Sequence, residues 1–291
     1  MSTSRTAVAP TRASLARARR RHRWSAVLIA LLVLLGSATM LYPAAASWFS
    51  DRIQAAAGDR YTEAVSALAP EDRADRLADA EEYNDLLRGG AIPDPFGAIT
   101  EETVIDADDP YWSLLDAGDG TMARIRIPSI DVDLPIYHGT AADVLRQGVG
   151  HLQGTSLPIG GAGSHTVLTG HRGLTEATLF TRLDEMDDGD VIEIDVYGET
   201  LAYRVTEVQV VLPTDVDALR PVAGSDLLTL VTCTPLGVNS HRILVTAERI
   251  DATEIPEAVT PDAWPVPWWL VAYCAVLVGT TGYLASAMRR R

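Results

Sequence analysis

The residues best suited to chemistry lie together in the stretch Thr229–Arg242. Cys233 ends an apolar, strand-like run there, and a turn containing proline, glycine and asparagine leads to Arg242, which enters a second apolar run. The stretch thus predicts a thiol and a cation on adjacent strand ends. A cysteine in this position is either a buried, inert core residue or an accessible nucleophile, and its position alone leaves both interpretations open.

A cysteine nucleophile needs a group that moves a proton and a donor that stabilises the developing oxyanion. If Arg242 points toward Cys233, its neighbour His241 points away, because adjacent side chains of a strand face opposite ways. His171 is the favoured base, since it follows a strand-like run and flanking glycines let a loop present its imidazole. His138 and His165 are the alternative bases, whereas the other external histidines, His151 and His241, are expected to make hydrogen bonds in the core or in turns.

Neither a metal nor a phosphate-bearing cofactor is expected. No cysteine pair or cluster of histidines and acids has a convincing zinc-site pattern. The glycine cluster Ile159–Gly163 lacks the lysine of a P-loop, and the chain contains no lysine at all.

Charge is distributed unevenly along the 291 residues, whose formal net charge is −15. All basic residues apart from histidine are arginine, and seven of the 24 precede Trp24 while three close the chain, whereas no Asp or Glu precedes Asp51 or follows Asp262. The acidic middle of the chain would repel nucleic acid, so no nucleic-acid partner is expected. A positively charged partner fits this charge, and so does an ordinary solvated acidic surface.

Two apolar segments are long enough to cross a bilayer, residues 24–46 and 267–288. The basic ends outside them, 1–23 and 289–291, predict that both termini are cytoplasmic and that the intervening domain lies outside the plasma membrane. Ala44–Ala46 also fits a cleavage signal, so the first segment is either an anchor or a removable signal peptide.

This topology separates the two cysteines of the chain. Cys274 lies within the second apolar segment and Cys233 in the external domain, so they cannot form an intramolecular disulfide. An exported protein gains little from keeping an oxidisable thiol without a partner, which favours a reactive role for Cys233.

Helical patterns precede the core in a membrane-proximal region, residues 47–90. One helix is expected over Asp51–Leu68, and a second begins at Pro70 and stops at Gly89-Gly90, forming an α-hairpin. A proline-rich loop and acidic linker follow at 91–121.

From residue 122 to 252 the pattern predicts a mainly β domain, a barrel or a sandwich, followed by a linker at 253–266. Short helices are expected at Ala141–Arg146 and Glu176–Leu183. The expected strands are Ala123–Pro128, Val132–Ile136, His165–Leu168, Val191–Tyr197, Leu201–Leu212, the run that ends at Cys233, and His241–Ile250.

Several blocks in this region, in order, resemble class C sortases, the pilus-building cysteine transpeptidases of Gram-positive bacteria. Thr229-Leu-Val-Thr-Cys233 is similar to the sortase signature, and the sequence onward to Arg242 is similar to its class C continuation, except that Leu236 stands where an aromatic is common. The other similar blocks are Leu134–Thr140, Gly148–Leu152, Gly154–Pro158 and Thr169–Gly173.

The resemblance implies a sortase-type closed β-barrel with Cys233 as nucleophile, His171 as acid/base and Arg242 as the oxyanion-stabilising or substrate-orienting group. It also implies an LPXTG-like sorting signal, borne by a pilin or surface protein and cleaved at its Thr-Gly bond, and a pilin lysine amine as acceptor. A lid before the barrel is implied by Asp94, Pro95 and Phe96, with the acid pairing the arginine and the ring covering the thiol.

Three alternatives differ from this interpretation. A housekeeping-type sortase would attach surface proteins to peptidoglycan, and a membrane-tethered cysteine peptidase would release the free acid. A non-catalytic pilus or wall component would carry LPXTG before its terminal apolar segment, and residues 251–267 contain no such motif.

Overall fold

The computed structural model describes residues 12–87, 109–251, 253 and 266–289, with side chains from residue 20 onward. The chain divides into two compact units, one within Ser47–Thr260 and the other combining the two ends of the chain. The helices are α1 (Arg12–Ala67), α2 (Pro70–Leu86), α3 (Val144–Gln147) and α4 (Trp268–Arg289). The strands are β1 (Thr121–Ile127), β2 (Val132–His138), β3 (Val149–His151), β4 (His165–Thr169), β5 (Val191–Val196), β6 (Glu199–Val211), β7 (Leu227–Thr234) and β8 (His241–Ile250).

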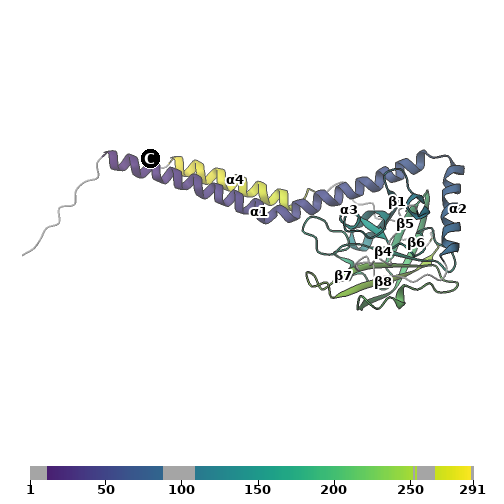
Figure 1. Cartoon of the computed structure of the whole chain (residues 1–291). Helices are drawn as coiled ribbons and strands as arrows, with labels where there is room; N and C mark the ends of the chain where they lie inside the picture. Colours follow the sequence, from purple (N-terminus) through teal and green to yellow (C-terminus); the bar gives the residue numbers. More distant parts are fainter. Residues whose placement is uncertain (1–11, 88–108, 252, 254–265, 290–291) are drawn as a thin grey trace, which may run out of the picture. The chain divides into compact units, whose positions relative to one another are not determined.

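The strands form a closed barrel in the order β1-β2-β3-β4-β7-β8-β6-β5, which the antiparallel pairing of β1 with β5 completes (Figure 1). Two neighbouring pairs are parallel, β2 with β3 and β4 with β7. Alternate residues of each strand fill the interior, as the two-residue period of a strand requires. Ile125, Ile136, Ile194 and Leu230 are among the fully enclosed side chains of this core.

The closed β-barrel predicted from the resemblance is therefore confirmed. Two details of the sequence interpretation need correction. Glu176–Leu183 is not a helix: the segment forms turns, and only Leu183–Glu185 makes one turn of 3-10 helix. Leu179 has a φ of 42°, in the left-handed region, which a helix cannot contain. The short helix expected at Ala141 begins three residues later, at Val144.

Both α1 and α4 are long and apolar enough, by length and composition, to cross a membrane. Large apolar side chains of the first segment, such as Leu28, Leu32 and Leu35, are exposed, as side chains that face lipid would be. The helix expected over Asp51–Leu68 is the continuation of α1 itself, which runs unbroken past Pro43. α2 begins at Pro70, as predicted, with Glu71 and Asp72 in its first turn.

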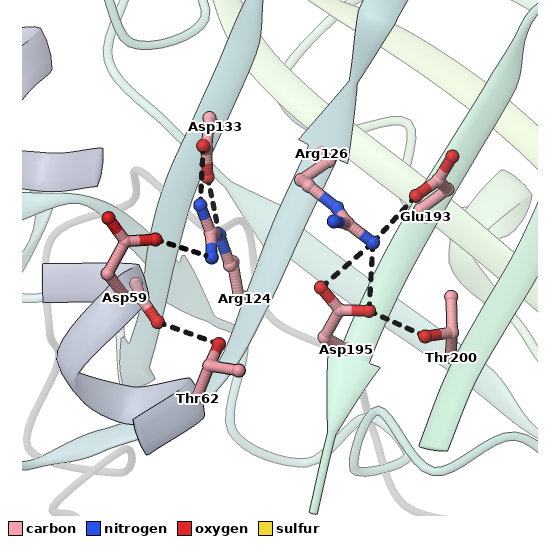
Figure 2. Close-up of polar contacts among 9 residues, drawn as sticks. Asp59, Thr62, Arg124, Arg126, Asp133, Glu193, Asp195 and Thr200 are labelled. Carbon is pink, nitrogen blue, oxygen red and sulfur yellow. Dashed lines mark hydrogen bonds and ion pairs between the residues drawn. The ribbon is translucent and has the colours of Figure 1, made fainter. Parts of the chain in front are cut away.

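The part of α1 after Ser47 packs on the outside of the barrel and belongs to its fold. Arg124 of β1 donates from Nε and Nη2 to Asp133 of β2, both at 2.6 Å, and its Nη1 lies 3.0 Å from Asp59 of α1 (Figure 2). A Cβ on Gly58 would lie 2.8 Å from Arg124 Nε, so this close approach requires glycine. Tyr61, which is 2% exposed, accepts a hydrogen bond from the amide of Tyr197 at 2.9 Å.

Arg126, on the same outer face of β1, lies between two acids of β5 (Figure 2). Its Nη2 is 2.8 Å from Glu193 and 3.0 Å from Asp195. The cross-strand pairs hold the register of β1, β2 and β5 on the side where α1 docks.

His151 is fully buried beneath the turn at Pro110–Ser113 and links that turn to the barrel. Its Nε2 donates to the carbonyl of Ser156 at 2.9 Å, which leaves Nδ1 to accept from the hydroxyl of Tyr111 at 2.9 Å. Burial lowers the pKa of His151 to about 4. The folded protein therefore holds this imidazole neutral.

We predict that the fold loses stability as the pH falls from about 6.5 to about 4. The unfolded chain takes up a proton at His151 in this interval while the folded chain does not, so the free energy of unfolding decreases, by about 3 kcal/mol for the full pKa difference. Urea unfolding of the detergent-solubilised chain at pH 7 and pH 5 measures the loss. His151→Gln should reduce the pH dependence, and His22→Gln, on an exposed position of α1, should not; equal pH dependence in the two variants would contradict the assignment.

Candidate active site

Cys233 and Arg242 lie directly opposite each other in the antiparallel pair β7–β8, and Thr234 lies opposite His241. Directly opposed residues project on the same side of a sheet, so the thiol and the guanidinium share one face. That face is the outside of the barrel: Leu228 and Leu230 of β7 fill the interior core, and the residues that alternate with them point away from it.

The surface next to Cys233 is apolar. Val231, the next residue of β7 on the same face, packs with Leu244 of β8 and Val167 of β4. Leu219, which follows β6, packs on this cluster from outside and leaves its members nearly inaccessible. The outer face of β4, β7 and β8 thus provides an apolar floor that ends at the thiol.

His171 is brought to the same end of the sheet by the parallel pairing of β4 with β7. Thr169 pairs with Val231, and the amide of Gly170 donates to the Val231 carbonyl at 3.1 Å. The hydroxyl of Thr232 donates to the Gly170 carbonyl at 2.7 Å. Gly170, the residue before His171, is therefore bonded to both Val231 and Thr232, the two residues that precede Cys233.

The threonines of the motif Thr229–Cys233 have distinct structural roles. Thr232 makes the bond to Gly170 just described, while the Thr229 hydroxyl lies 2.8 Å from Nε2 of His165 and 3.1 Å from the Thr246 hydroxyl. One threonine fixes the middle of β7 to both neighbouring strands, and the other fixes its end to the loop that carries His171. The sequence analysis did not predict the hydrogen bonds of Thr229 and Thr232. The spacing of the two threonines in the motif is the feature that could have indicated them.

The other histidines are held in structural contacts. His138 is 2.7 Å from the Leu114 carbonyl, and His165 is 3.1 Å from the Arg220 carbonyl in addition to its contact with Thr229. Burial lowers the pKa of both imidazoles. His241 contacts the hydroxyl of its neighbour Ser240 at 2.9 Å. His138 and His165, the alternative bases, are thus held in structural contacts, and the contact of His241 agrees with the turn role expected for it.

Cys233 is 9% exposed and Arg242 7%. Nη1 of Arg242 donates to the carbonyls of Asn239 and His241, at 3.1 and 3.2 Å. These bonds fix the guanidinium against the β7–β8 turn, on the face that carries the thiol. Cys233 is thus buried yet lies outside the main core, a combination that neither of the two initial interpretations contained.

His171 is half-buried, and its pKa is lowered by burial first and by the positive charge of Arg146 second. Arg146 lies in α3, before β3. Both effects disfavour the imidazolium, so the imidazole is neutral near pH 7. A neutral imidazole can accept a proton from a thiol or an amine.

Asp94, Pro95 and Phe96 lie outside the described residues. Neither cysteine of the chain forms a disulfide bond, and Cys274 is in α4. Within residues 12–87, 109–251, 253 and 266–289, no group of three or more histidine, cysteine or acidic residues is arranged to hold a metal ion.

Comparison with known proteins gives a family. The model of the sortase domain matches residues 125–250. The crystal structure of sortase C-1 from Actinomyces oris is 50% identical, with a TM-score of 0.58, over 62% of this chain and 99% of that one. Sortase C of Streptococcus pneumoniae is 37% identical, with a TM-score of 0.60, over 67% and 96%. Sortase D of Bacillus subtilis is 32% identical over 130 residues, 43% of this chain and 62% of that protein.

The chain therefore belongs to the sortase family of cysteine transpeptidases. These two solved neighbours are sortases of class C, which confirms the resemblance seen in the sequence motifs. The chain spans about three fifths of the length of the curated relatives that it matches.

We predict that Arg146→Gln raises the pKa of His171, because it removes a positive charge that opposes protonation of the imidazole. Arg146 is exposed, so the shift should be a fraction of a pH unit and should shrink at high salt. An NMR titration of His171, assigned with a His171→Ala variant, measures it. Arg146→Lys keeps the charge and should titrate like the parent; a shift equal to that of Arg146→Gln would assign the effect to packing instead.

Proposed function

We propose that this protein is a membrane-anchored pilin polymerase. It cleaves an LPXTG-like sorting signal between threonine and glycine and transfers the threonyl acyl group to a lysine amine of another pilin subunit. The observation that carries the proposal is the placement of Cys233 directly opposite Arg242, on the outer face of the barrel, at the end of the strand that pairs with the His171-bearing strand.

In the proposed reaction the neutral imidazole of His171 accepts the proton of the Cys233 thiol, and the sulfur attacks the threonine carbonyl carbon. The developing oxyanion accepts hydrogen bonds from Arg242, whose guanidinium is held at the thiol's face by the two backbone carbonyls described above. The tetrahedral intermediate collapses, the carbon–nitrogen bond to glycine breaks, and the imidazolium of His171 gives its proton to the leaving amine. A thioester on Cys233 and a neutral imidazole remain.

Aminolysis reverses these roles. The lysine amine attacks the thioester carbonyl, His171 accepts a proton from the amine, and the sulfur leaves from the acyl carbon. The product is an isopeptide bond, and the thiol is regenerated. The strongly acidic external domain would attract a cationic amine, and the chain offers no lysine side chain of its own as a competing acceptor.

The membrane arrangement is part of the proposal. The basic residues outside the two apolar segments support a topology in which both termini are cytoplasmic and the barrel lies outside the plasma membrane. Sorting signals on exported proteins would reach Cys233 from that side. The partners are then the bilayer and pilin or surface proteins that bear the signal.

Incubation of the detergent-solubilised chain with an LPXTG-type peptide should give an acyl adduct on Cys233, detectable by mass. The control Cys233→Ala should give none. With a pilin lysine peptide present, an isopeptide product is expected. Transfer to a peptidoglycan stem amine in preference to lysine would favour the housekeeping alternative, and release of free acid despite abundant amine would favour a peptidase.

The sequence motif at Asp94, Pro95 and Phe96 supports a second element of the proposal, a lid over the thiol. Asp94→Ala and Phe96→Ala should each increase the rate at which a thiol reagent labels Cys233, measured in a Cys274→Ala background so that one thiol reacts. Glu82→Ala, at an exposed position of α2, is the control and should leave the rate unchanged. Unchanged rates in both lid variants would contradict a cover over Cys233.

A further inference from the structure

The loop that carries His171 has no strand partner along most of its length. From Gly170 to Arg182 the chain forms turns, and residues 173–176 are exposed. A loop of this kind varies in position unless side chains fix it. An imidazole presented from it can act on Cys233 only if other contacts hold it in place.

Arg172, the residue after His171, supplies such contacts from a nearly buried guanidinium whose side chain is 9% exposed. Its Nε donates to the Thr181 carbonyl at 3.1 Å, and its Nη1 donates to the Thr234 hydroxyl at 3.0 Å. Its Nη2 donates to the Asp184 carboxylate. Three donors of one rigid, planar group thus engage two separate segments, the stretch Thr181–Asp184 and the end of β7.

The bond to Thr234 is the most informative of the three. Thr234 follows Cys233 directly in β7, and Arg172 follows His171 directly in the loop. The hydrogen bond therefore joins the two neighbours of the proposed catalytic pair. Together with the Thr232 bond to Gly170 at 2.7 Å, it links β7 and the His171 loop on both sides of the pair.

Further contacts hold the rest of this loop against its own first residues and against α1. The Phe180 amide donates to the His171 carbonyl at 3.1 Å, and the Phe180 ring lies so close to Gly170 that a Cβ there would be 2.6 Å away. On the outer side, Asp51 of α1 accepts from the Thr178 amide at 3.3 Å and from its hydroxyl at 2.9 Å. The Arg172 contacts thus act on a loop whose far end is already fixed.

We propose that Arg172 is a positioning residue that holds the imidazole of His171 in reach of the thiol of Cys233 through its hydrogen bond to Thr234. The inference rests on the proposed roles of His171 and Cys233. Arg172 itself touches neither reacting atom in this assignment, in contrast to Arg242, which lies opposite the thiol. The two arginines thus have different tasks at one site.

Loss of the Arg172–Thr234 bond should misplace the imidazole without removing it. A displacement of about 1 Å in a catalytic group costs about 100-fold in rate. The loss should fall on kcat, with KM little changed, because the imidazole acts on the transition state more than on substrate binding. The protonation coupling between His171 and Cys233 should weaken as well.

The test uses the full chain in detergent, in a Cys274→Ala background so that only Cys233 is alkylated. Thr234→Val removes the hydroxyl with little change of shape, and Thr234→Ser keeps it. Arg172→Gln removes the guanidinium, and Arg182→Gln is its control, since Arg182 pairs with Asp131 and Glu185 in the same region but is more exposed. The readouts are kcat and KM for acyl transfer and the pH midpoint of Cys233 alkylation by iodoacetamide.

We expect kcat to fall about 10- to 100-fold in Arg172→Gln and Thr234→Val, with KM within about twofold. The alkylation midpoint should move toward that of His171→Ala in both, while Thr234→Ser and Arg182→Gln match the parent. The double variant Arg172→Gln/Thr234→Val should be no worse than Arg172→Gln alone.

An alkylation midpoint that stays at the parent value in Thr234→Val and Arg172→Gln would overturn the proposal, whatever the change in kcat. A parent midpoint equal to that of His171→Ala would also overturn it, because no coupling would then exist to be positioned. If Arg172→Gln does not fold, the Thr234→Val and Thr234→Ser pair decides. Alkylation needs no peptide, so failure of the parent to transfer acyl groups would count against the proposed function and leave this test intact.

Discussion

The parallel pairing of β4 with β7 is the constraint on which the site depends. His171 and Cys233 are far apart in the sequence, and each follows or ends a strand of this pair. Parallel neighbours present the same ends of their strands at one edge, so both residues arrive at one place. The intervening chain forms β5 and β6, which close the barrel and bring β8 to the other side of β7.

Hydrogen bonds from side chains convert this coarse proximity into a defined arrangement. Backbone pairing holds β7 only where it has strand partners. The loop after β4 is no longer paired with β7 at the position of His171. Thr232 and Arg172 continue the connection beyond the end of the ladder. The strand pairing of the barrel thus brings His171 and Cys233 to the same edge of the sheet. The hydrogen bonds of Thr232 and Arg172 then fix their relative positions as closely as catalysis requires.

Electrostatics at the site differ from those of the chain as a whole. The protein is strongly acidic, yet two arginines lie near the proposed reacting groups: Arg242 opposite the thiol, and Arg146 close enough to lower the pKa of His171. A local cationic environment favours a thiolate and an oxyanion. The acidic surroundings favour the approach of a cationic acceptor, so the two charge patterns serve different stages of the proposed reaction.

Most strands could be predicted from the sequence, because the period-two alternation of apolar and polar residues is visible there. β8 has the predicted bounds, His241–Ile250, and the parity argument that selected Arg242 over His241 agrees with the register of β7 and β8. The order of strands in the barrel is not local information, so only the resemblance to a family indicated closure.

The loop after His171 could not be predicted in the same way. Its apolar residues Leu179, Phe180 and Leu183 suggested a helix, whereas tertiary contacts bury these side chains in turns. Arg172 was interpreted only as part of a motif, since one of its partners, Thr234, is distant in the sequence and the other two, Thr181 and Asp184, lie in a segment predicted to be helical or just beyond it. Long-range side-chain contacts of this kind leave no periodic signal in the chain.

The docking of α1 has a practical consequence for where the catalytic unit begins. The family match starts at residue 125, inside β1, and a fragment cut there would contain Cys233, His171 and Arg242. It would lack Arg124 together with its partner Asp59, the Tyr61 hydroxyl that satisfies the Tyr197 amide, and the Asp51 carboxylate that holds Thr178. The contacts that complete the barrel therefore extend beyond the matched sortase domain, and they come from the helix that carries the first apolar segment.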